Sequence, residues 1–577
     1  MKVVLAKTAG FCMGVRRAME IVMAEANKKE GPLFTFGPLI HNQQVLDILE
    51  AKGVKATDDV RELTSGRIII RAHGIPPRER ELLERTGLKV IDATCPKVTR
   101  VQQIIRHYSN KGHSAIIVGD QNHAEVIGLM GYSKSPAHVI QEETDVAGLP
   151  LVDRPFVVAQ TTQNEEKFNR IIEALKRRFP DLLVFDTICD ATHERQQEVR
   201  TFKGQVDAVV VVGGYHSANT QRLARISEEE SLPTFHVQTE QDLDKDKLSR
   251  MSVIGLTAGA STPHWMIRNV LQEIEAIRDR RETFLTRWLK QAFRFMVLSN
   301  LLVASGAFSL AYAAAIMAGR DPVSPFPALA FLYIFAMHVF NRFLDKGASA
   351  YNEPDRASFL KTHKVLLNIA GITALAMALA LSCRVGVITF LALTGLSALG
   401  IIYSIPLVPD RIGDRYRYSK IKDIPGSRSL SEALAWVAVI SLLPALDTRG
   451  VDVPAAIMTG MVVFTWSYAR AIFFSLLQVQ GDLMVGTETL PIILGERRTL
   501  MLLRIIFLIT AFVLLVSPAL GIAGLFCYIM LIPLCTLWSS LLAYERQWLC
   551  PGITLEALVE TNFLLTGLLA LIWQSWR

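Results

Sequence analysis

Cysteine is scarce in this chain, and its few copies do not pair. The 577 residues include 7 cysteines, an odd number, and no two of them form a Cys-x-x-Cys knuckle. This spacing argues against the disulfide framework of a small secreted protein and against the short ligand spacings typical of zinc sites. The segment that follows Met1 reads as a strand running into a loop rather than as a secretory signal. We therefore expect the first half to stay in the reducing cytosol.

A large excess of one charge is also missing. The formal net charge is only +7, and the basic residues concentrate in loops beside long apolar runs. Basic loops beside apolar runs are typical of oriented membrane proteins, whereas nucleic-acid binding calls for a basic surface that neutralises phosphates. We therefore expect no nucleic-acid partner. Glycine-rich motifs for flavin or nicotinamide binding are not evident either.

Hydropathy changes abruptly near residue 285. Before this point charged and apolar residues interleave, and after it long apolar runs dominate. Runs of about 20 apolar residues are long enough to cross a bilayer as helices. We predict a soluble region over 1–280, a connector helix over 281–294, and an all-α integral membrane domain of eight or nine helices over 295–577.

Basic residues in the connector and in the loop 409–428 indicate the orientation of the chain. Because short cytoplasmic loops carry an excess of Lys and Arg, we expect both segments to be cytoplasmic. This would make the chain a multi-pass protein of the cell membrane with its N-terminal region in the cytoplasm.

Short apolar strands alternate with amphipathic helices in the first half. The strand candidates are residues 2–6, 68–72, 89–93, 115–119, 156–160, 182–186, 208–214 and 252–259. Continuous apolar strands separated by helices predict parallel sheets in α/β units. The repeats suggest three similar α/β sections around a common centre, with functional residues at the carboxyl ends of the strands.

Three cysteines of the first half have similar surroundings. Cys12 in TAGFCMGV, Cys95 in IDATCPKVT and Cys189 in FDTICDAT each follow a short apolar run. Soft thiolates suit iron–sulfur clusters or zinc, and buried structural cysteine is a third interpretation. If the three loops meet, a cluster held by three thiolates would keep one iron open for chemistry.

Polar side chains follow several of the predicted strands, often beside glycine. They are His41, His73, His123, Glu125, Thr161, Ser217, Asn219 and Ser261. A single histidine on such a loop is usually a surface or capping residue. Three histidines together with repeated hydroxyl and amide groups predict an anion cage suited to a diphosphate.

Residues 1–278 closely resemble the 4-hydroxy-3-methylbut-2-enyl diphosphate reductase family. The resemblance lies in TAGFCMGVRRAM, HGIPP, DATCPKV, HAEVIGLMGY, AQTTQ, VVGGYHSANTQRL and GLTAGASTP, which occur in this order. It implies reductive dehydroxylation of that diphosphate to isopentenyl and dimethylallyl diphosphate, in the non-mevalonate route to isoprenoids. It also implies a [4Fe–4S] cluster and an external electron donor of the ferredoxin or flavodoxin type.

The same resemblance implies a role for each site residue. Cys12, Cys95 and Cys189 match cluster ligands, and His41, His73, Ser217, Asn219 and Ser261 match diphosphate-binding positions. His123 matches a residue near the diphosphate and the substrate hydroxyl, Glu125 the proton-delivering acid, and Thr161 a partner that positions this acid or the substrate. Ala218 stands where the family often has a second serine. We expect this to weaken binding there by about 1 kcal/mol.

Residues 295–577 bear a weaker resemblance to the UbiA superfamily of intramembrane prenyltransferases. That resemblance implies two Asp-rich loops that hold Mg²⁺ on a prenyl diphosphate, since Mg²⁺ prefers oxygen ligands. Asn341 and Asp345 in NRFLDKGASAYNEPDR fit the first loop, and Asp482 in LLQVQGDLMVGTETLPIILG fits the second. Tyr403 and Lys420 lie where diphosphate contacts are expected.

Three expected acids are replaced in these loops, by Arg342, Ser349 and Gln478. Two magnesium ions would then have few anionic ligands. Either the domain uses one metal, or Arg342 substitutes for metal charge, or catalysis has been lost. Active prenyl transfer and a non-catalytic membrane or substrate-handling role both stay open.

Three functions are compatible with the sequence. The leading hypothesis is a cytoplasm-facing iron–sulfur reductase joined to a prenyltransferase-like membrane domain. A second hypothesis is a membrane prenyltransferase whose first half regulates or senses redox state. A third makes the first half a cluster-carrying binding protein without turnover. The partners expected under the leading hypothesis are a prenyl diphosphate, the electron donor and membrane lipid.

Overall fold

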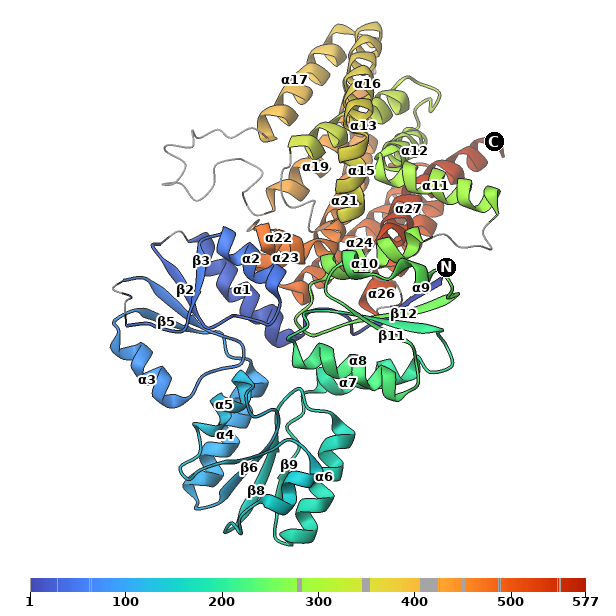
Figure 1. The fold of residues 1–577 in the computed structure, drawn as a ribbon. Coiled ribbons are helices and arrows are strands. Elements are labelled where there is room, and N and C mark those ends of the chain that lie inside the picture. Colours follow the sequence, from blue (N-terminus) through green and yellow to red (C-terminus); the bar gives the residue numbers. More distant parts are fainter. Residues whose placement is uncertain are drawn as a thin grey trace. The chain divides into compact units, whose positions relative to one another are not determined.

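The computed structural model consists of two compact units, Met1–Arg280 and Arg281–Arg577. It describes residues 2–28, 30–61, 63, 65–277, 283–344, 353–404, 424, 426–447, 452–485, 487, 489–546, 548 and 552–576. The predicted site residues Asp345 and Lys420 lie outside these ranges. Figure 1 shows the ribbon coloured along the chain, and each unit is described below by itself.

Three four-stranded sheets form the first unit, and every pairing in them is parallel. The first has the order β1 (Lys2–Leu5), β12 (Val253–Ala258), β10 (Ala208–Val212), β11 (Thr234–Val237). The second has the order β5 (Lys89–Asp92), β4 (Arg67–Ile70), β2 (Leu33–Phe36), β3 (Val54–Thr57). The third has the order β9 (Leu183–Phe185), β8 (Pro155–Ala159), β6 (Ser114–Val118), β7 (His138–Ile140). The predicted α/β fold with three similar sections is confirmed.

Each sheet has a cysteine at the same place. The edge strands β1, β5 and β9 are the ones that run into Cys12, Cys95 and Cys189. The first sheet pairs the first strand of the unit with its last, in the register Val4 to Gly255. The first sheet is therefore built from both ends of the first unit. This brings Cys12 next to a loop that lies more than 200 residues later in the chain.

The predicted strands match eight of the twelve strands found. The four that were missed are β2, β3, β7 and β11. Three of these are the edge strands opposite the cysteine strands. These three strands, VKAT, HVI and TFHV, are short and mix polar with apolar residues, so they lack the continuous apolar run by which the other strands are recognised.

Helices cover the sheets and follow ordinary capping rules. They are α1 (Met13–Asn27), α2 (Gln43–Ala51), α3 (Pro77–Arg85), α4 (Pro96–Asn110), α5 (Ala124–Met130), α6 (Glu165–Arg178), α7 (Asp190–Thr201), α8 (Ala218–Glu229), α9 (Lys245–Leu248) and α10 (His264–Ala276). In α6, Phe168, Ile171 and Leu175 form the buried face, and the Asn164 side chain caps the N-terminus by accepting from the Lys167 N–H. This spacing of three to four residues is what buries one helix face on a sheet.

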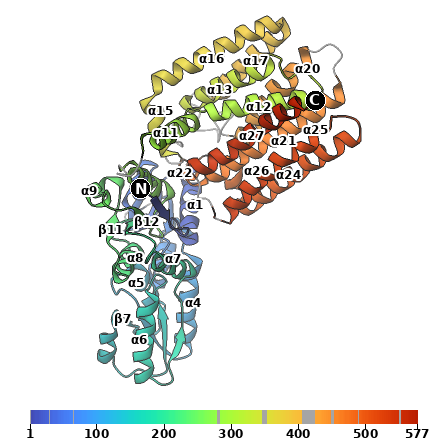
Figure 2. The same ribbon diagram turned by 90° about the vertical axis from the view of Figure 1, so that its right-hand side faces the viewer.

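Every element in the described part of the second unit is a helix. They are α11 (Phe284–Leu298), α12 (Leu301–Met317), α13 (Phe326–Leu344), α15 (Pro354–Thr362), α16 (Lys364–Val385), α17 (Val387–Ser404), α19 (Ser427–Val437), a π-helical segment (Ala438–Leu442), α20 (Leu443–Asp447), α21 (Val453–Leu477), α22 (Val479–Val485), α23 (Leu490–Leu494), α24 (Glu496–Ala519), α25 (Phe526–Ile529), α26 (Leu531–Glu545) and α27 (Ile553–Ser575). Figure 2 shows the long helices lying side by side as a bundle. The predicted all-α second half is confirmed.

Seven of the described helices are long and apolar enough to cross a membrane. The count becomes eight if α11 and α12, which meet at a bend of 70°, form one span. Asn300 makes this bend in the left-handed region at φ 66°, which asparagine tolerates better than most residues. The predicted upper count of nine also included α17, whose described part is too short to qualify.

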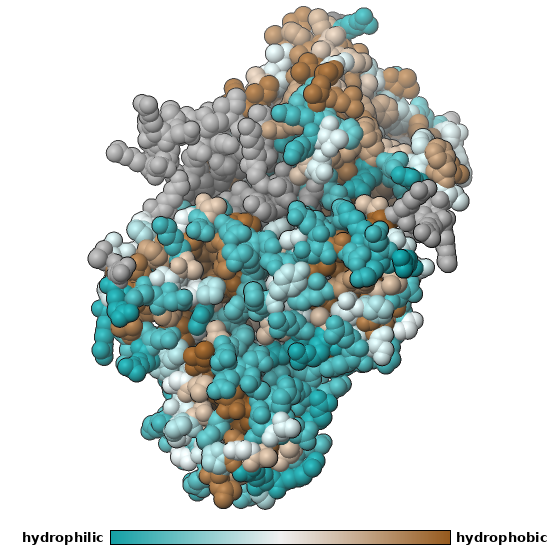
Figure 3. Space-filling model, in the orientation of Figure 1, coloured by the Kyte–Doolittle hydropathy of each residue, from teal (hydrophilic) through white to brown (hydrophobic). Residues whose placement is uncertain are grey.

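Apolar side chains remain exposed on the outside of the helical unit. On α24, Met501, Leu508 and Phe512 are each at least 60% exposed. Figure 3 shows hydrophobic residues gathered on this unit, whereas hydrophilic residues dominate the visible face of the first. A water-soluble bundle would bury such a surface. The second half is therefore that of a multi-pass membrane protein.

Candidate functional site

The three predicted cluster cysteines occupy equivalent positions in their sections. Cys12, Cys95 and Cys189 are the N-cap residues of α1, α4 and α7. The backbone N–H of Val15 donates a hydrogen bond to the Cys12 sulfur at 3.5 Å. A helix N-terminus presents backbone N–H groups and partial positive charge, which suit an anionic ligand.

The three thiols lie close enough to affect one another electrostatically. The thiols of Cys12 and Cys189 both raise the pKa of Cys95, after the larger effect of burial. Soft thiolates that come from three separate sections suit an iron–sulfur cluster, in which each thiolate binds a different iron.

Gly14 keeps the space between two of the thiols open. A Cβ atom at this position would lie 2.5 Å from the Cys95 sulfur and 3.9 Å from the Cys12 sulfur. No side chain can therefore stand here without moving Cys95. The open space beside Gly14 and the three soft sulfur donors fit an iron–sulfur cluster.

Arg195 is a buried cation beside the cysteines that sequence reasoning missed. Its guanidinium donates to the carbonyl oxygens of Gly10 at 2.7 Å and Ala191 at 2.8 Å. It lies near enough to Cys12 and Cys189 for their charges to affect its pKa, which burial lowers. A fixed positive charge at this place offsets part of the negative charge of thiolates. Its ERQQ context looks like an ordinary solvated helix, so nothing in the sequence pointed to it.

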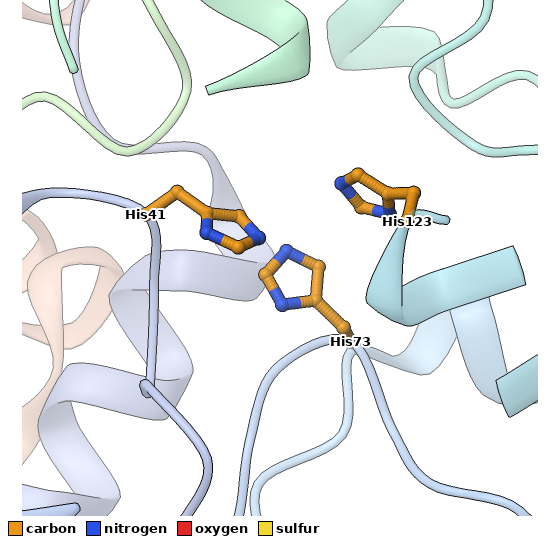
Figure 4. A group of neighbouring side chains, drawn as sticks. All are labelled: His41, His73 and His123. Atoms are coloured by element: carbon orange, nitrogen blue, oxygen red, sulfur yellow. The ribbon is translucent and has the colours of Figure 1, made fainter. Parts of the chain in front are cut away.

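Three histidines from two sheets face one another, as Figure 4 shows. His41 and His73 follow β2 and β4 of the second sheet, and His123 follows β6 of the third. The ring centroids lie 4.8 Å apart for His41–His73, 5.5 Å for His41–His123 and 5.3 Å for His73–His123. The structure thus brings together three of the predicted diphosphate contacts.

The surroundings of the three histidines favour their uncharged form. Burial, together with Arg71 and the neighbouring imidazoles, lowers the pKa of His41 and takes that of His73 well below its usual value. Burial first, and then the neighbouring charges, lowers the pKa of His123 to about 4. Buried nitrogens of His41 (Nε2) and His73 (Nδ1) have no hydrogen-bond partner among the described residues. Unpaired buried groups are costly, so the pocket is suited to a ligand that pairs with them, and three neutral imidazoles could also hold a metal ion.

Glu125 is buried beside this triad and is held by Thr161. One carboxylate oxygen accepts from the Thr161 N–H at 2.7 Å, and the other accepts from the Thr161 hydroxyl at 2.9 Å. The Glu125 N–H donates to His123 Nδ1 at 3.1 Å, which leaves His123 Nε2 as the proton-bearing nitrogen. Burial raises the pKa of Glu125 despite the hydrogen bonds from Thr161. The group is therefore suited to keep a proton and deliver it.

Arg222 ties the loops that carry this acid to helix α8, and it too was missed from the sequence. It donates to the Thr162 carbonyl at 2.9 Å, to the Thr162 hydroxyl at 3.0 Å and to Asp120 at 2.6 Å. Its side chain is only 11% exposed. In TQRLAR it looks like a surface residue of an amphipathic helix, and only the packing of α8 against the third sheet's loops reveals its contacts.

The N-terminus of α8 completes the polar pocket. The Ser217 hydroxyl caps the helix by accepting from the Thr220 N–H at 3.4 Å. The buried Nδ2 of Asn219 and hydroxyl of Thr220 have no partner among the described residues. The Ser261 hydroxyl donates to the His41 carbonyl at 3.3 Å, which joins the loop after β12 to the histidine loop. A helix N-terminus with unpaired donors is an anion-binding arrangement.

The helical unit contains a cavity of about 440 Å³. Apolar side chains of α13, α17 and α19 line one part of it, among them Ile334, Leu396 and Trp436. Two of the predicted site residues, Asn341 and Tyr403, line its polar part. The third described one, Asp482, is fully buried in α22 and is not among the cavity-lining residues.

Buried ion pairs surround the polar part of this cavity. Arg356 donates to Glu353 at 2.6 Å and to Glu556 at 2.8 Å, and Arg470 donates to Glu560 at 2.9 Å. Charges inside a membrane protein are costly unless they are paired, and they often mark a site. Arg342 and Gln478, which replace acids expected from the UbiA resemblance, also contact Glu353. The described residues therefore do not form a pair of open carboxylate sites for Mg²⁺.

Comparisons with known proteins divide the chain at the same place. Residues 3–275 match the LytB protein family, and residues 301–549 match the UbiA prenyltransferase family. A 4-hydroxy-3-methylbut-2-enyl diphosphate reductase of Geobacter sulfurreducens is 41% identical over 282 residues, which are 49% of this chain and 100% of that protein. The reductase of Geotalea daltonii is 44% identical over 277 residues, 48% of this chain and 98% of that protein.

Two solved structures are similar to different halves of the chain. The E-1-hydroxy-2-methyl-but-2-enyl-4-diphosphate reductase from Plasmodium falciparum has 31% identity and a TM-score of 0.46, and it covers 47% of this chain and 87% of its own. A UbiA homologue from Archaeoglobus fulgidus bound to DMAPP and Mg²⁺ has 17% identity and a TM-score of 0.33, and it covers 48% and 98%. From the sequence matches, the chain belongs to the LytB protein family through its first half, fused to a UbiA-family membrane domain.

Proposed function

We propose that residues 1–280 convert 4-hydroxy-3-methylbut-2-enyl diphosphate into isopentenyl and dimethylallyl diphosphate. The observation that carries this proposal is the buried Glu125, held by Thr161 beside a triad of neutral histidines. Such a pocket joins a proton donor to a diphosphate-binding arrangement. The relatives that match this half over nearly their full length are named as reductases of this substrate.

The reaction breaks the allylic carbon–oxygen bond of the substrate. Two electrons enter, one proton joins the departing hydroxyl to form water, and a second proton joins either end of the allyl group. The two possible protonation sites give the two isomeric products. A [4Fe–4S] cluster on Cys12, Cys95 and Cys189 would supply the one-electron steps and an open iron at the reacting centre. We propose an external donor of the ferredoxin or flavodoxin type for the electrons.

The diphosphate would bind at the carboxyl ends of the strands, where the three sheets converge. Neutral His41, His73 and His123 can each donate an N–H to phosphate oxygens. Ser217 and Asn219 add side-chain donors at the N-terminus of α8, and Ser261 adds one from the first sheet's last loop. Backbone N–H groups at a helix start strengthen this contact with the anion. The bound diphosphate would leave the hydroxyl end of the substrate directed toward Glu125 and the cysteines.

Glu125 would deliver the proton that allows the hydroxyl to leave. Burial keeps its carboxyl protonated to higher pH than an exposed glutamate, and this is the state a general acid needs. Thr161 fixes the orientation of the carboxyl through two hydrogen bonds. Because His123 accepts from the Glu125 N–H, the diphosphate contact and the acid are parts of one rigid turn.

The test is an anaerobic assay of the full-length chain with the purified substrate and a chemical one-electron reductant. We expect both C5 diphosphates as products, together with the absorption of an iron–sulfur cluster. A chain that carries the cluster but shows no turnover with any reductant would contradict the proposal. Prenyl transfer that continues without reductase turnover would instead support the redox-sensing alternative.

A second proposed function is handling of a prenyl diphosphate in the helical unit. It is supported by the UbiA-family match and by a cavity with an apolar part and an arginine-lined part. Membranes that contain the full chain can be tested for transfer of a labelled prenyl group to a lipid-soluble acceptor. Loss of transfer in Asp482→Ala would support catalysis, and binding without transfer would support a substrate-handling role. For both functions we propose that the first unit faces the cytoplasm.

A further inference from the structure

Two residues of the helical unit that stand where the UbiA pattern has acids contact the same carboxylate. Arg342 lies near the end of α13, and Gln478 is the C-cap residue of α21. The Arg342 guanidinium lies 3.2 Å from a Glu353 oxygen, and the Gln478 side-chain amide donates to Glu353 as well. Positions 342 and 478 are far apart in the sequence, and each departs from the UbiA pattern in a different loop. Their convergence on one residue indicates that the two departures belong to one arrangement.

Glu353 itself is a buried and well-bonded carboxylate. It is 5% exposed and also accepts from Arg356 at 2.6 Å. Arg356 continues the chain of contacts to Glu556 on α27 at 2.8 Å. The bonds thus link α13, α21 and α27 to Glu353, the residue before α15. We call Arg342, Glu353 and Gln478 the clamp.

The clamp has the wrong charge for a divalent cation. Mg²⁺ needs carboxylate and other oxygen ligands, whereas a guanidinium carries only donors and remains positive in proteins. A cation that bound Glu353 would have to displace Arg342 and Arg356 and leave buried charges unpaired, which is strongly unfavourable. An arginine fork is instead suited to phosphate oxygens. Arg342 lines the cavity, as do Arg428 and Arg470.

We propose that the Arg342–Glu353–Gln478 clamp takes the place of the divalent metal in the helical unit. The cavity then holds the head group of an isoprenoid phosphate through arginine and amide donors, with no requirement for Mg²⁺. The identity of this ligand rests on the second function proposed above, whereas the replacement of the metal does not. The two parts are tested separately.

The first test measures metal binding directly. The full-length, cluster-loaded chain in detergent is titrated with Mn²⁺, and free Mn²⁺ is followed by electron paramagnetic resonance. We expect the double variant Arg342→Asp/Gln478→Asp to bind one more Mn²⁺ per chain than the unmodified protein. The matched control Arg342→Asn/Gln478→Asn breaks the clamp without adding carboxylates, so it should gain none.

Two results would overturn the metal replacement. One is a stoichiometric Mn²⁺ site in the unmodified chain that Asp482→Asn removes, and this arm does not depend on whether any clamp variant folds. The other is a folded Asp/Asp variant, with the elution profile of the unmodified protein, that gains no Mn²⁺.

The second test measures ligand binding with labelled farnesyl diphosphate. The chain carries His73→Ala here, to weaken the diphosphate pocket of the first unit. We expect dissociation constants in EDTA and in Mg²⁺ to agree within twofold, and to rise at least tenfold in Arg342→Gln. Tenfold weaker binding in EDTA would overturn the metal-independent mode. Failure to bind in both conditions would contradict the proposed ligand, and the Mn²⁺ titration would still decide the role of the clamp.

Discussion

Glu125 and Thr161 are joined by two hydrogen bonds, of 2.7 Å from the Thr161 N–H and 2.9 Å from its hydroxyl. The two residues follow neighbouring strands of the third sheet, β6 and β8. Because parallel strands end at the same edge, residues 36 positions apart meet with fixed geometry. The pair gives the proposed acid its orientation, and burial gives it its raised pKa.

Replacing Glu125 by glutamine should remove proton delivery without disturbing the cluster. We expect unchanged cluster absorption and a fall in turnover of about 10²–10⁴, the usual contribution of a general acid. Glu173→Gln, on the exposed side of α6, is the matched control and should keep normal turnover. Near-normal turnover in the Glu125 variant would reject its role.

Turnover should decline as pH rises through the pKa of Glu125, because the acid must be protonated to act. Burial raises this pKa above that of an ordinary glutamate, so the decline lies at higher pH than for an exposed carboxyl. The raised pKa of Glu125 also makes folding stability depend on pH. The contribution of this carboxyl to the free energy of unfolding is fully present at pH values below its pKa in the unfolded chain. It is lost as pH rises through the pKa of the carboxyl in the folded protein. A decline that is equally present in Glu125→Gln would contradict the assignment.

Arg222 should act as a positioning residue for this acid. Its positive charge lowers the pKa of Glu125, against the larger effect of burial. Arg222→Gln should therefore move the decline of turnover at alkaline pH to higher pH. Arg222→Lys should retain the positive charge and lose the hydrogen bonds to Thr162. Arg225→Gln, exposed on the same helix, should leave the pH profile unchanged. An identical profile in all three variants would limit Arg222 to a structural role.

A methyl group at position 14 should block the cluster while leaving the fold intact. Gly14→Ala places a Cβ where it would lie 2.5 Å from the Cys95 sulfur. Alanine favours a helix over glycine by up to about 1 kcal/mol, so helix α1 itself should not suffer. We expect lower iron content and weaker cluster absorption with an unchanged circular dichroism spectrum. Gly148→Ala, which has open space around it, is the control.

Loss of Arg356 should destabilise the helical unit. Arg356→Met would leave the buried Glu353 and Glu556 without their shared partner. Breaking a buried ion pair by removing one partner costs about 3–5 kcal/mol. Thermal unfolding of the detergent-solubilised chain should occur at lower temperature, and Arg384→Met, at an exposed helix end, should have little effect. Equal transition temperatures would contradict the importance of this pairing.

Local patterns predicted the central parts of the fold well. The strands with continuous apolar runs, such as Ile68–Ile70, are fully buried. The strands β3, β7 and β11 escaped prediction, since these short segments mix polar with apolar residues. Arg195 and Arg222 escaped for a related reason: each lies on a helix whose sequence looks solvated. Their burial depends on the meeting of different sections, which no local pattern records.

The order of residues along the chain alone determined which groups are available for chemistry: three thiols, three histidines, one acid and two membrane-domain loops with missing carboxylates. Only the tertiary structure decided which of these groups meet. It joined the first strand to the last, brought the histidine triad together from two sheets, and placed Arg342 and Gln478 on one carboxylate. The physical reason is that packing of strand ends and helix faces sets distances between residues far apart in sequence, whereas local propensity acts only over a few neighbouring residues.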